Sequence, residues 1–167
     1  SNTFLLYGAN GYTGELIARY ARQFELQPIL AGRNKEVIES LANKLQLPFR
    51  VLDLNDEAAL LVALMEVKAV IHAAGPFQFT AKQMIEACLK TGTHYLDING
   101  DIAVFELIKR YDSAAKKAGI MLLPGVGFDV VPTDCLALQL KKLLPDALTL
   151  QLAFATLGGG LSHGTAI

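Results

Sequence analysis

Three glycines near the start of the chain have the spacing of a phosphate-binding turn. Gly8, Gly11 and Gly14 follow the apolar run at residues 4–7 and precede a helix-like stretch. After a buried strand, Gly8 permits a sharp turn, Gly11 leaves bare backbone for a pyrophosphate, and Gly14 allows close packing of the helix on the sheet. The first amides of that helix lack acceptors within it, and its dipole favours negative charge there. The segment therefore predicts a dinucleotide-binding turn.

The residue at the end of the second predicted strand indicates which dinucleotide is bound. About 20 residues after the glycines, an acidic side chain would bind the adenosine ribose 2′-hydroxyl. Arg33 stands there instead. Because a guanidinium makes bidentate bonds to a 2′-phosphate and stacks on adenine, Arg33 favours NADP over NAD. In the alternative interpretation, Arg33 is a solvated loop residue beside the helix cap Asn34.

The third predicted strand ends in Asp53 and Leu54. Asp53 is a candidate acceptor for the adenine amino group, and Leu54 is a candidate to pack against the adenine ring. The alternative is that Asp53 caps the next helix. Both interpretations stay open at this point.

The fourth predicted strand ends in small residues and a proline. Ala73, Ala74 and Gly75 would let the ribose and pyrophosphate of the cofactor approach the backbone, and Pro76 redirects the chain. This segment belongs where a doubly wound sheet binds its ligand, at the switch point beside the first strand. The alternative is a plain turn.

Two aspartates follow the last predicted strands. Asp97 closes the fifth strand, and Asp129 lies in PGVGFDVVPTD after the sixth. Because ligands lie outside the carboxyl ends of the strands, both are candidates to contact substrate beside the nicotinamide. The alternative for Asp97 is a bond to neighbouring backbone amides. We interpret Asp134 as a structural residue that caps the helix containing Cys135.

The elements that must position these residues alternate along the chain. Helix-like spacing follows the first glycines and recurs between strand-like runs, with the capping candidates Asn34, Asn55 and Thr80. Strands are predicted at 27–31, 48–52, 69–74, 94–98 and 119–123, and helices at 34–46, 56–67, 80–91 and 103–118. The alternation predicts a doubly wound (Rossmann) α/β fold: a mostly parallel six-stranded sheet in the order 3-2-1-4-5-6, with helices on both faces.

The last part of the chain departs from this alternation. A helix is predicted at 132–144, and apolar residues alternate with others at 148–154 as in a strand with one covered face. We therefore expect residues 1–131 to form the dinucleotide-binding domain. Residues 132–167 are expected to be a connecting helix and the start of a truncated C-terminal substrate or dimerisation domain. Ser1 and Asn2 are interpreted as an expression remnant.

Composition limits the classes of partner. Hydrophobic residues make up 52% of the 167 residues and charged residues 19%, which suits a compact soluble domain. The net charge of −1 gives no basic surface for nucleic acid, and the apolar runs are too short to span a membrane. The cysteines, expected to be buried thiols, and the histidines show no metal-ligand spacing. We expect a cytoplasmic protein without a metal.

Five segments together resemble the N-terminal domain of the saccharopine dehydrogenase-like family, which includes trans-acting enoyl reductases: GANGYTG, AGRN, HAAGPF, THYLDINGD and PGVGFDVVPTD. The likeness spans nearly the whole chain. It implies an NADP-dependent oxidoreductase with a longer C-terminal region that completes the substrate site and mediates homodimerisation. THYLDINGD departs from the family pattern, because it ends in Asp101 where Glu is expected in many relatives.

The resemblance also implies roles for single residues. The phosphates would be held by Gly8, Ala9, Asn10, Gly11, Tyr12, Thr13 and Gly14, the 2′-phosphate by Arg33, and the nicotinamide side by Ala74, Gly75 and Pro76. The expected activity is hydride transfer to a C=N, C=C or C=O bond of a small metabolite or acyl substrate, with this fragment inactive alone. Two alternatives stay open: a non-catalytic nucleotide-binding, redox-sensing or scaffold module, and an interaction domain that binds no nucleotide.

Overall fold

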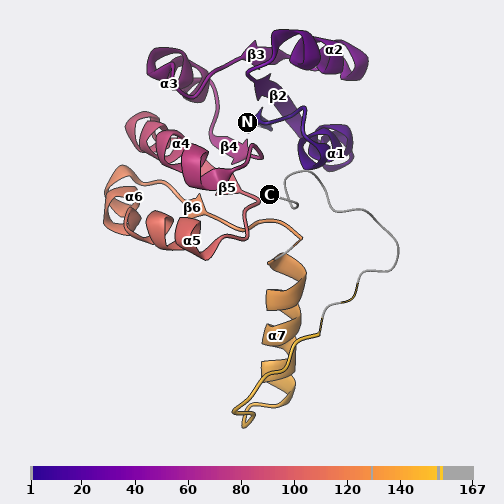
Figure 1. Ribbon diagram of the computed structural model, residues 1–167, viewed down its shortest axis with the longest axis vertical. Helices are drawn as coiled ribbons and strands as arrows, with labels where there is room; N and C mark the ends of the chain where they lie inside the picture. Colours follow the sequence, from indigo (N-terminus) through magenta and orange to yellow (C-terminus); the bar gives the residue numbers. More distant parts are fainter. Residues whose placement is uncertain (1, 129, 154, 156–167) are drawn as a thin grey trace.

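The computed structural model describes residues 2–128, 130–153 and 155. In these residues the chain alternates between strands and helices, as the sequence predicts (Figure 1). The strands are β1 (Thr3–Tyr7), β2 (Gln27–Gly32), β3 (Phe49–Val51), β4 (Ala69–His72), β5 (His94–Asp97) and β6 (Leu122–Leu123). The helices are α1 (Tyr12–Tyr20), the 3₁₀ helix η1 (Ala21–Phe24), α2 (Lys35–Leu45), α3 (Glu57–Met65), α4 (Phe77–Thr91), α5 (Ile102–Lys109), α6 (Asp112–Ala118) and α7 (Val131–Leu143).

The strands form one six-stranded sheet in the order β3-β2-β1-β4-β5-β6, with every neighbouring pair parallel. This confirms the predicted doubly wound topology. The order reverses between β1 and β4, so the loops that follow these two strands meet at the switch point. The register pairs Tyr7 with His72 and His72 with Asp97. These three side chains therefore lie in one row on the same face of the sheet.

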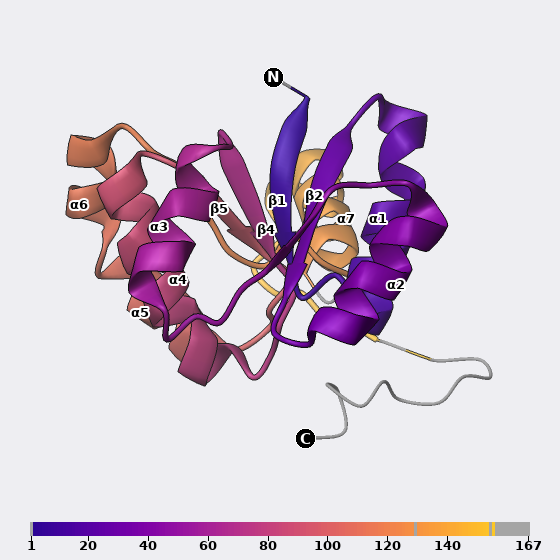
Figure 2. The same cartoon turned by 90° about the horizontal axis from the view of Figure 1, so that it is seen from above.

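Helices cover both faces of the sheet (Figure 2). The smaller core lies under α1 and α2 and includes Leu6, Leu30 and Ile38, all fully buried. The larger core lies under α3 and α4 and extends to α5 and α6. Strands buried on both faces read as continuous apolar runs, which is why β1 and β2 were recognisable in the sequence.

Helix starts follow local hydrogen bonding, and two of the three predicted caps are wrong. Asn34 caps α2 by accepting from the N–H of Val37 at 3.2 Å, as predicted. Asp56, not Asn55, caps α3, because its carboxylate accepts from the N–H of Ala59 at 3.0 Å. The helix α4 begins directly after Pro76, so Thr80 lies in its first turn rather than at its cap.

The helix predicted at 103–118 is two helices, α5 and α6. The break lies at Tyr111, whose backbone angles leave the helical region and whose hydroxyl donates to Glu86 of α4 at 2.8 Å. Anchoring this ring to another helix turns the chain, so apolar spacing alone could not show the break. The strand predicted at 119–123 shortens to Leu122–Leu123, because Gly119 ends α6 with a positive φ of 68°.

The helix α7 projects away from the sheet (Figure 1). It has no buried residue and leaves Leu136, Leu138 and Leu143 exposed. Cys135 is exposed as well, contrary to the expected buried thiol, whereas Cys88 is buried. The capping role expected for Asp134 is also wrong, because α7 begins at Val131 and Asp134 lies within its first turn.

Residues 148–153 do not form the predicted strand. Leu148 is 97% exposed, and no strand of the sheet pairs with this segment in the described residues. Without a partner, an alternating pattern cannot make the hydrogen bonds of a strand. Residue 154 and the glycines at 158–160 lie outside the described residues. Among the described helices, none has the length and apolar character needed to cross a bilayer.

Candidate functional site

The turn after β1 brings its backbone close to that of two neighbouring strands. Gly8 has φ of +84°, and a Cβ atom there would lie 2.7 Å from the backbone of Ala73 and Ala74. The N–H groups of Gly8 and Ala9 donate to the carbonyl of Ala31 at 2.9 and 3.2 Å. These bonds fix the start of the turn against β2, while the absent side chain lets it pack against the end of β4.

Close packing continues at the start of α1. A Cβ atom on Gly14 would lie 2.2 Å from the carbonyl oxygen of Gly8, so only glycine permits this approach of helix and turn. At Gly11 the nearest such atom is the same oxygen at 3.4 Å, an ordinary contact. Gly14 is thus required by packing, whereas a Cβ atom on Gly11 would make only ordinary contacts.

The first turn of α1 offers backbone donors. Glu15 is the first residue of the helix whose N–H finds a carbonyl, that of Gly11 at 2.8 Å. The N–H groups of Tyr12, Thr13 and Gly14 donate to no carbonyl of the described residues. Unpaired N–H groups at a helix N-terminus, with the positive end of the helix dipole, form a site for a phosphate or another anion.

Arg33 lies at the carboxyl end of β2, beside this turn in the sheet order. Its side chain is exposed and makes no ion pair or hydrogen bond with another described residue. The neighbouring Asn34 is engaged in capping α2. A Cβ atom on Gly32 would lie 3.0 Å from Oδ1 of Asn10, which places the glycine turn against the end of β2. The cation is therefore available to a ligand phosphate at this edge.

Tyr7 links this region to the end of β3. Burial raises the pKa of Tyr7, and the charge of Arg33 acts in the opposite direction. The backbone of Leu54 acts on this pKa in the same direction as Arg33. Leu54 is buried in the core, although it was expected against the adenine ring. The predicted ring contact would therefore involve only its small exposed surface.

Asp53 forms a local turn. Its Oδ1 accepts from both the backbone N–H and the side-chain amide of Asn55 at 2.9 Å. It does not cap the next helix, which was one alternative, because Asp56 does so. Its side chain is exposed, so its second carboxylate oxygen is open to solvent. The adenine contact proposed for it is sterically accessible.

The turn after β4 lies at the other side of the switch point, where a doubly wound sheet binds its ligand in a crevice. The N–H of Ala73 donates to the carbonyl of Tyr7 at 2.7 Å, and the turn then runs through Ala74, Gly75 and Pro76 into α4. Gly75 and Pro76 are exposed. Since Gly8 packs directly on Ala73 and Ala74, the turns after β1 and β4 form adjoining walls.

His72, directly before this turn, is fully buried. Its Nε2 lies 3.0 Å from Oγ1 of Thr80, and Nδ1 has no partner among the described residues. Tyr7, Phe77 and Tyr95 surround the imidazole, with ring centroids at 5.5, 5.2 and 6.2 Å. Burial lowers the pKa of His72 to about 3, so the ring is neutral near neutral pH.

Asp97 is buried at the centre of a hydrogen-bond network. Its carboxylate accepts from the Tyr95 hydroxyl at 2.7 Å, from the backbone and side-chain amides of Asn99 at 3.0 and 2.6 Å, and from the N–H of Gly125 at 2.9 Å. Its carbonyl accepts from the N–H of Val126 at 2.8 Å. The backbone bonds named as the alternative are therefore present, and a substrate contact would require some of them to open.

Two further aspartates, Asp101 and Asp129, belong to the loops after β5 and β6. Asp129 lies outside the described residues, so its substrate contact stays a prediction. Asp101 caps α5 by accepting from the N–H of Ala103 at 2.8 Å. The carboxylate that ends THYLDINGD is thus engaged at a helix start.

Residues that position the site were missed in the sequence. Tyr7 and His72 look like ordinary strand residues in the sequence, and Thr80 was predicted only as a helix cap. Their only signal is position: Tyr7 and His72 end the two strands at the switch point, where the register pairs them. Their contacts depend on that pairing, and therefore on the tertiary structure.

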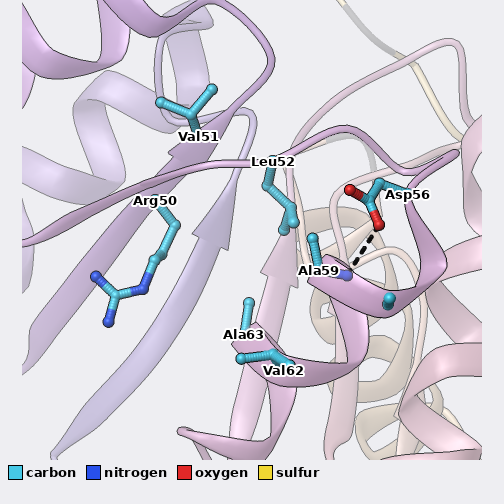
Figure 3. A pocket seen from close by; sticks show the side chains of 8 residues that line it. Arg50, Val51, Leu52, Asp56, Ala59, Val62 and Ala63 are labelled. Atoms are coloured by element: carbon cyan, nitrogen blue, oxygen red, sulfur yellow. Dashed lines mark hydrogen bonds between the residues drawn. The ribbon is translucent and has the colours of Figure 1, made fainter.

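A hollow of about 410 Å³ lies elsewhere, between β3 and α3 (Figure 3). Its lining is mostly apolar, with Arg50 at one side and Asp56 at the other. The full lining is Arg50, Val51, Leu52, Asp56, Ala58, Ala59, Val62 and Ala63. Neither Arg33 nor the glycine turn lines it. We therefore locate the candidate nucleotide site at the glycine turn, because of its backbone donors and close-packed glycines, and not at this hollow.

Curated relatives align with the chain over most of its length. It is 27% identical to a saccharopine dehydrogenase-like oxidoreductase of Bos taurus, over 93% of this chain and 41% of that protein. It is 28% identical to a trans-acting enoyl reductase of Mycobacterium ulcerans, over 78% of this chain and 33% of that protein. The chain thus spans less than half the length of these curated relatives.

A solved structure shares the fold. The apo saccharopine dehydrogenase (L-Glu forming) of Saccharomyces cerevisiae superimposes with a TM-score of 0.72 and 19% identity, over 87% of this chain and 32% of that one. The model of the saccharopine dehydrogenase NADP binding domain matches residues 4–123, which is more than half of the chain. NADP is the cofactor of that domain, and the free donors of α1 and the unpaired Arg33 fit it. The chain belongs to the saccharopine dehydrogenase-like family of NADP-binding oxidoreductases.

Proposed function

We propose that this chain is the NADP(H)-binding part of an enzyme that transfers hydride to a C=N, C=C or C=O bond of a small metabolite or acyl substrate. The observation that carries the proposal is the glycine turn with the unpaired N–H groups of Tyr12, Thr13 and Gly14, next to the unpaired Arg33. Backbone donors suit a pyrophosphate, and a free guanidinium suits a 2′-phosphate.

Each wall of the crevice has a proposed task. The backbone of residues 8–14 binds the pyrophosphate, and Arg33 with Asn34 binds the adenosine ribose and its 2′-phosphate. Asp53 and the edge of Leu54 contact the adenine, while residues 73–76 contact the nicotinamide half. NADPH, when bound, supplies the hydride, so the protein has to orient the cofactor and keep water away.

The substrate end is the less defined part of the proposal. Asp129 is proposed to contact substrate, and Asp97 to shape that end by holding the loop of Gly125 and Val126. The longer relatives suggest that a further C-terminal region completes the substrate site, so the fragment alone is expected to be inactive. We assign residues 132–167 to the link with that region. Homodimerisation through it and a cytoplasmic location stay predictions.

A non-catalytic nucleotide-binding module is the second candidate. It is favoured by the engagement of the Asp97 carboxylate and the burial of His72, which leave neither as a free acid or base. The two candidates differ in turnover. Loss of NADPH absorbance with imines, enoyl thioesters or carbonyl compounds supports the enzyme. NADPH binding by the full-length protein without turnover of any of these classes supports the module.

The cofactor assignment is tested by titrating the chain with NADPH and NADH side by side. We expect Arg33→Ala to weaken NADPH binding by about 1 to 3 kcal/mol, because a charge-assisted bond to the 2′-phosphate is lost. NADH binding should barely change. The measurement is the Kd of each cofactor by calorimetry.

Arg50 provides the matched control. It carries the same charge at the next strand but pairs with Glu66 at 2.8 Å, away from the glycine turn. Arg50→Ala should leave both cofactors bound as in the unaltered chain. Equal losses of NADPH and NADH in Arg33→Ala would refute the 2′-phosphate role, and absence of binding by the unaltered chain would refute the proposed function itself.

A further inference from the structure

The turn that forms the β4 wall of the crevice is held from inside the protein. Thr80, in the first turn of α4, has its Oγ1 2.9 Å from the carbonyl of Ala74 and 3.2 Å from that of Pro76. The same oxygen lies 3.0 Å from Nε2 of His72. One hydroxyl thus connects the end of β4, the turn and the start of α4.

The number of protons on the Thr80 hydroxyl determines which group donates in each of these hydrogen bonds. A hydroxyl has one proton to donate and lone pairs to accept with, and a carbonyl can only accept. The Thr80 proton therefore goes to the carbonyl of Ala74, its shorter partner, and Nε2 of His72 must be the donor to Oγ1. This leaves Nδ1 as the unprotonated nitrogen, and it has no hydrogen-bond partner among the described residues.

The imidazole of His72, which donates the first of these hydrogen bonds, cannot easily move. It is fully buried and enclosed by Tyr7, Phe77 and Tyr95. Rotation of the ring would break the bond between Nε2 and Thr80. A fixed donor thus orients the hydroxyl, and the oriented hydroxyl fixes the carbonyl of Ala74.

We propose that His72 and Thr80 are positioning residues that hold the Ala73–Pro76 turn in the shape that receives the nicotinamide half of NADP(H). This rests on the proposed function, since it assumes that the cofactor binds along the crevice. Gly8 packs on Ala73 and Ala74, so a displaced turn would also alter the junction of the two walls. The adenosine half, at Arg33 and Asp53, lies at the ends of other strands.

Two ligands separate the halves of the site. NADPH occupies the whole crevice, whereas adenosine 2′,5′-bisphosphate carries the adenosine and 2′-phosphate without the nicotinamide. We expect Thr80→Val, which keeps the shape but not the hydroxyl, to weaken NADPH binding about tenfold, the equivalent of one lost hydrogen bond. Binding of adenosine 2′,5′-bisphosphate should stay unchanged. Thr80→Ser should restore NADPH affinity.

Thr91→Val is the matched control. Thr91 lies in the last turn of α4 and bonds the carbonyl of Ala87 at 3.0 Å, far along the helix from the turn. We expect this variant to bind both ligands normally. Thermal unfolding is measured for every variant, and Thr80→Ala replaces Thr80→Val if the latter does not fold.

Distinct results identify which idea fails. Unchanged NADPH affinity in the Thr80 variants, or equal loss of both ligands, overturns the positioning role while leaving the cofactor site intact. Failure of the serine variant to restore affinity also overturns it. If the unaltered chain binds neither ligand, the proposed function fails first and the positioning role with it.

Discussion

At the scale of single residues, the glycines of the turn carry different physical constraints. Gly14 meets the carbonyl of Gly8 in a space where no Cβ fits, whereas Gly11 has an ordinary negative φ of −77° and room for a methyl group. One glycine is therefore needed for the packing of α1 on the sheet. Packing does not require the other.

This difference predicts that alanine affects a different property at each position: stability at Gly14 and cofactor binding at Gly11. Gly14→Ala should lower the free energy of unfolding by about 1 to 3 kcal/mol, because α1 must move away from the turn. Gly11→Ala should change it by less than about 1 kcal/mol but weaken NADPH and NADH alike, since its methyl group faces the phosphates. Urea unfolding and cofactor titration measure the two effects.

Each variant serves as the control for the other. Normal stability in Gly14→Ala would mean that the helix can shift without cost. Full cofactor binding by Gly11→Ala would place the pyrophosphate elsewhere than over this residue.

The sequence predicted the glycine turn because its glycines answer a local requirement of the backbone. Arg33 was recognisable for the same reason, since it stands at a fixed distance from that turn. The burial of Asp97 was not, because the donors Tyr95 and Gly125 come from a strand interior and from a distant loop. A carboxylate at a strand end looks the same in the sequence whether it faces a ligand or its own protein.

At the scale of elements, Asp97 connects β5, the start of α5 and the loop before α7. Its carboxylate satisfies the hydroxyl of Tyr95 and the N–H of Gly125, both buried groups. Asn99 extends the connection, because its side-chain oxygen accepts from the N–H of Asp101 at 2.9 Å. One side chain thus connects the loops at the carboxyl ends of the last two strands.

We expect Asp97→Ala to destabilise the fold by at least about 2 kcal/mol, because a buried donor without an acceptor costs about 1 to 3 kcal/mol. Asp53→Ala, which removes an exposed carboxylate with a local turn bond, should cost less than about 1 kcal/mol. Chemical denaturation of both variants provides the comparison. Equal and small losses would show that the network around Asp97 contributes little.

The division of the chain into elements was predicted where periodicity decides and was wrong where distant contacts decide. Parallel strands that are buried on both faces appear in the sequence as apolar runs, and regular crossovers appear as helix-like stretches between them. The strand order then follows from the fold type. The break at Tyr111 depends on Glu86 of another helix. Residues 148–153 of the predicted strand pair with no strand in the described part of the chain, and their alternating pattern alone could not supply a partner.

At the scale of the whole molecule, His72 ties stability to pH. Its pKa is about 3 in the folded protein and 6.5 as the ordinary value, because burial opposes the charged imidazolium. The groups around the ring are Tyr7, Phe77, Tyr95 and Thr80, and the nearest carboxylate in its row is Asp97. None of the rings or the hydroxyl provides a negative charge that would stabilise a protonated histidine.

The sign follows from proton binding. Well above pH 6.5 both states are neutral at this residue, so it adds no pH dependence there. As the pH falls below 6.5, the unfolded chain takes up the proton and the folded protein does not, so stability is lost. Between about pH 7 and about pH 5 the loss from His72 should be about 2 kcal/mol.

Urea unfolding of the unaltered chain and of His72→Gln at these two pH values tests this expectation. The glutamine does not titrate, so the variant should lose about 2 kcal/mol less than the unaltered chain over the same range, whatever its stability at neutral pH. Comparison between about pH 7 and about pH 8 is the internal control, because His72 is neutral in both states there. Parallel pH profiles for the two proteins between neutral and acidic pH would show that the folded protein accommodates a charged His72, and that the ring is less enclosed than its neighbours imply.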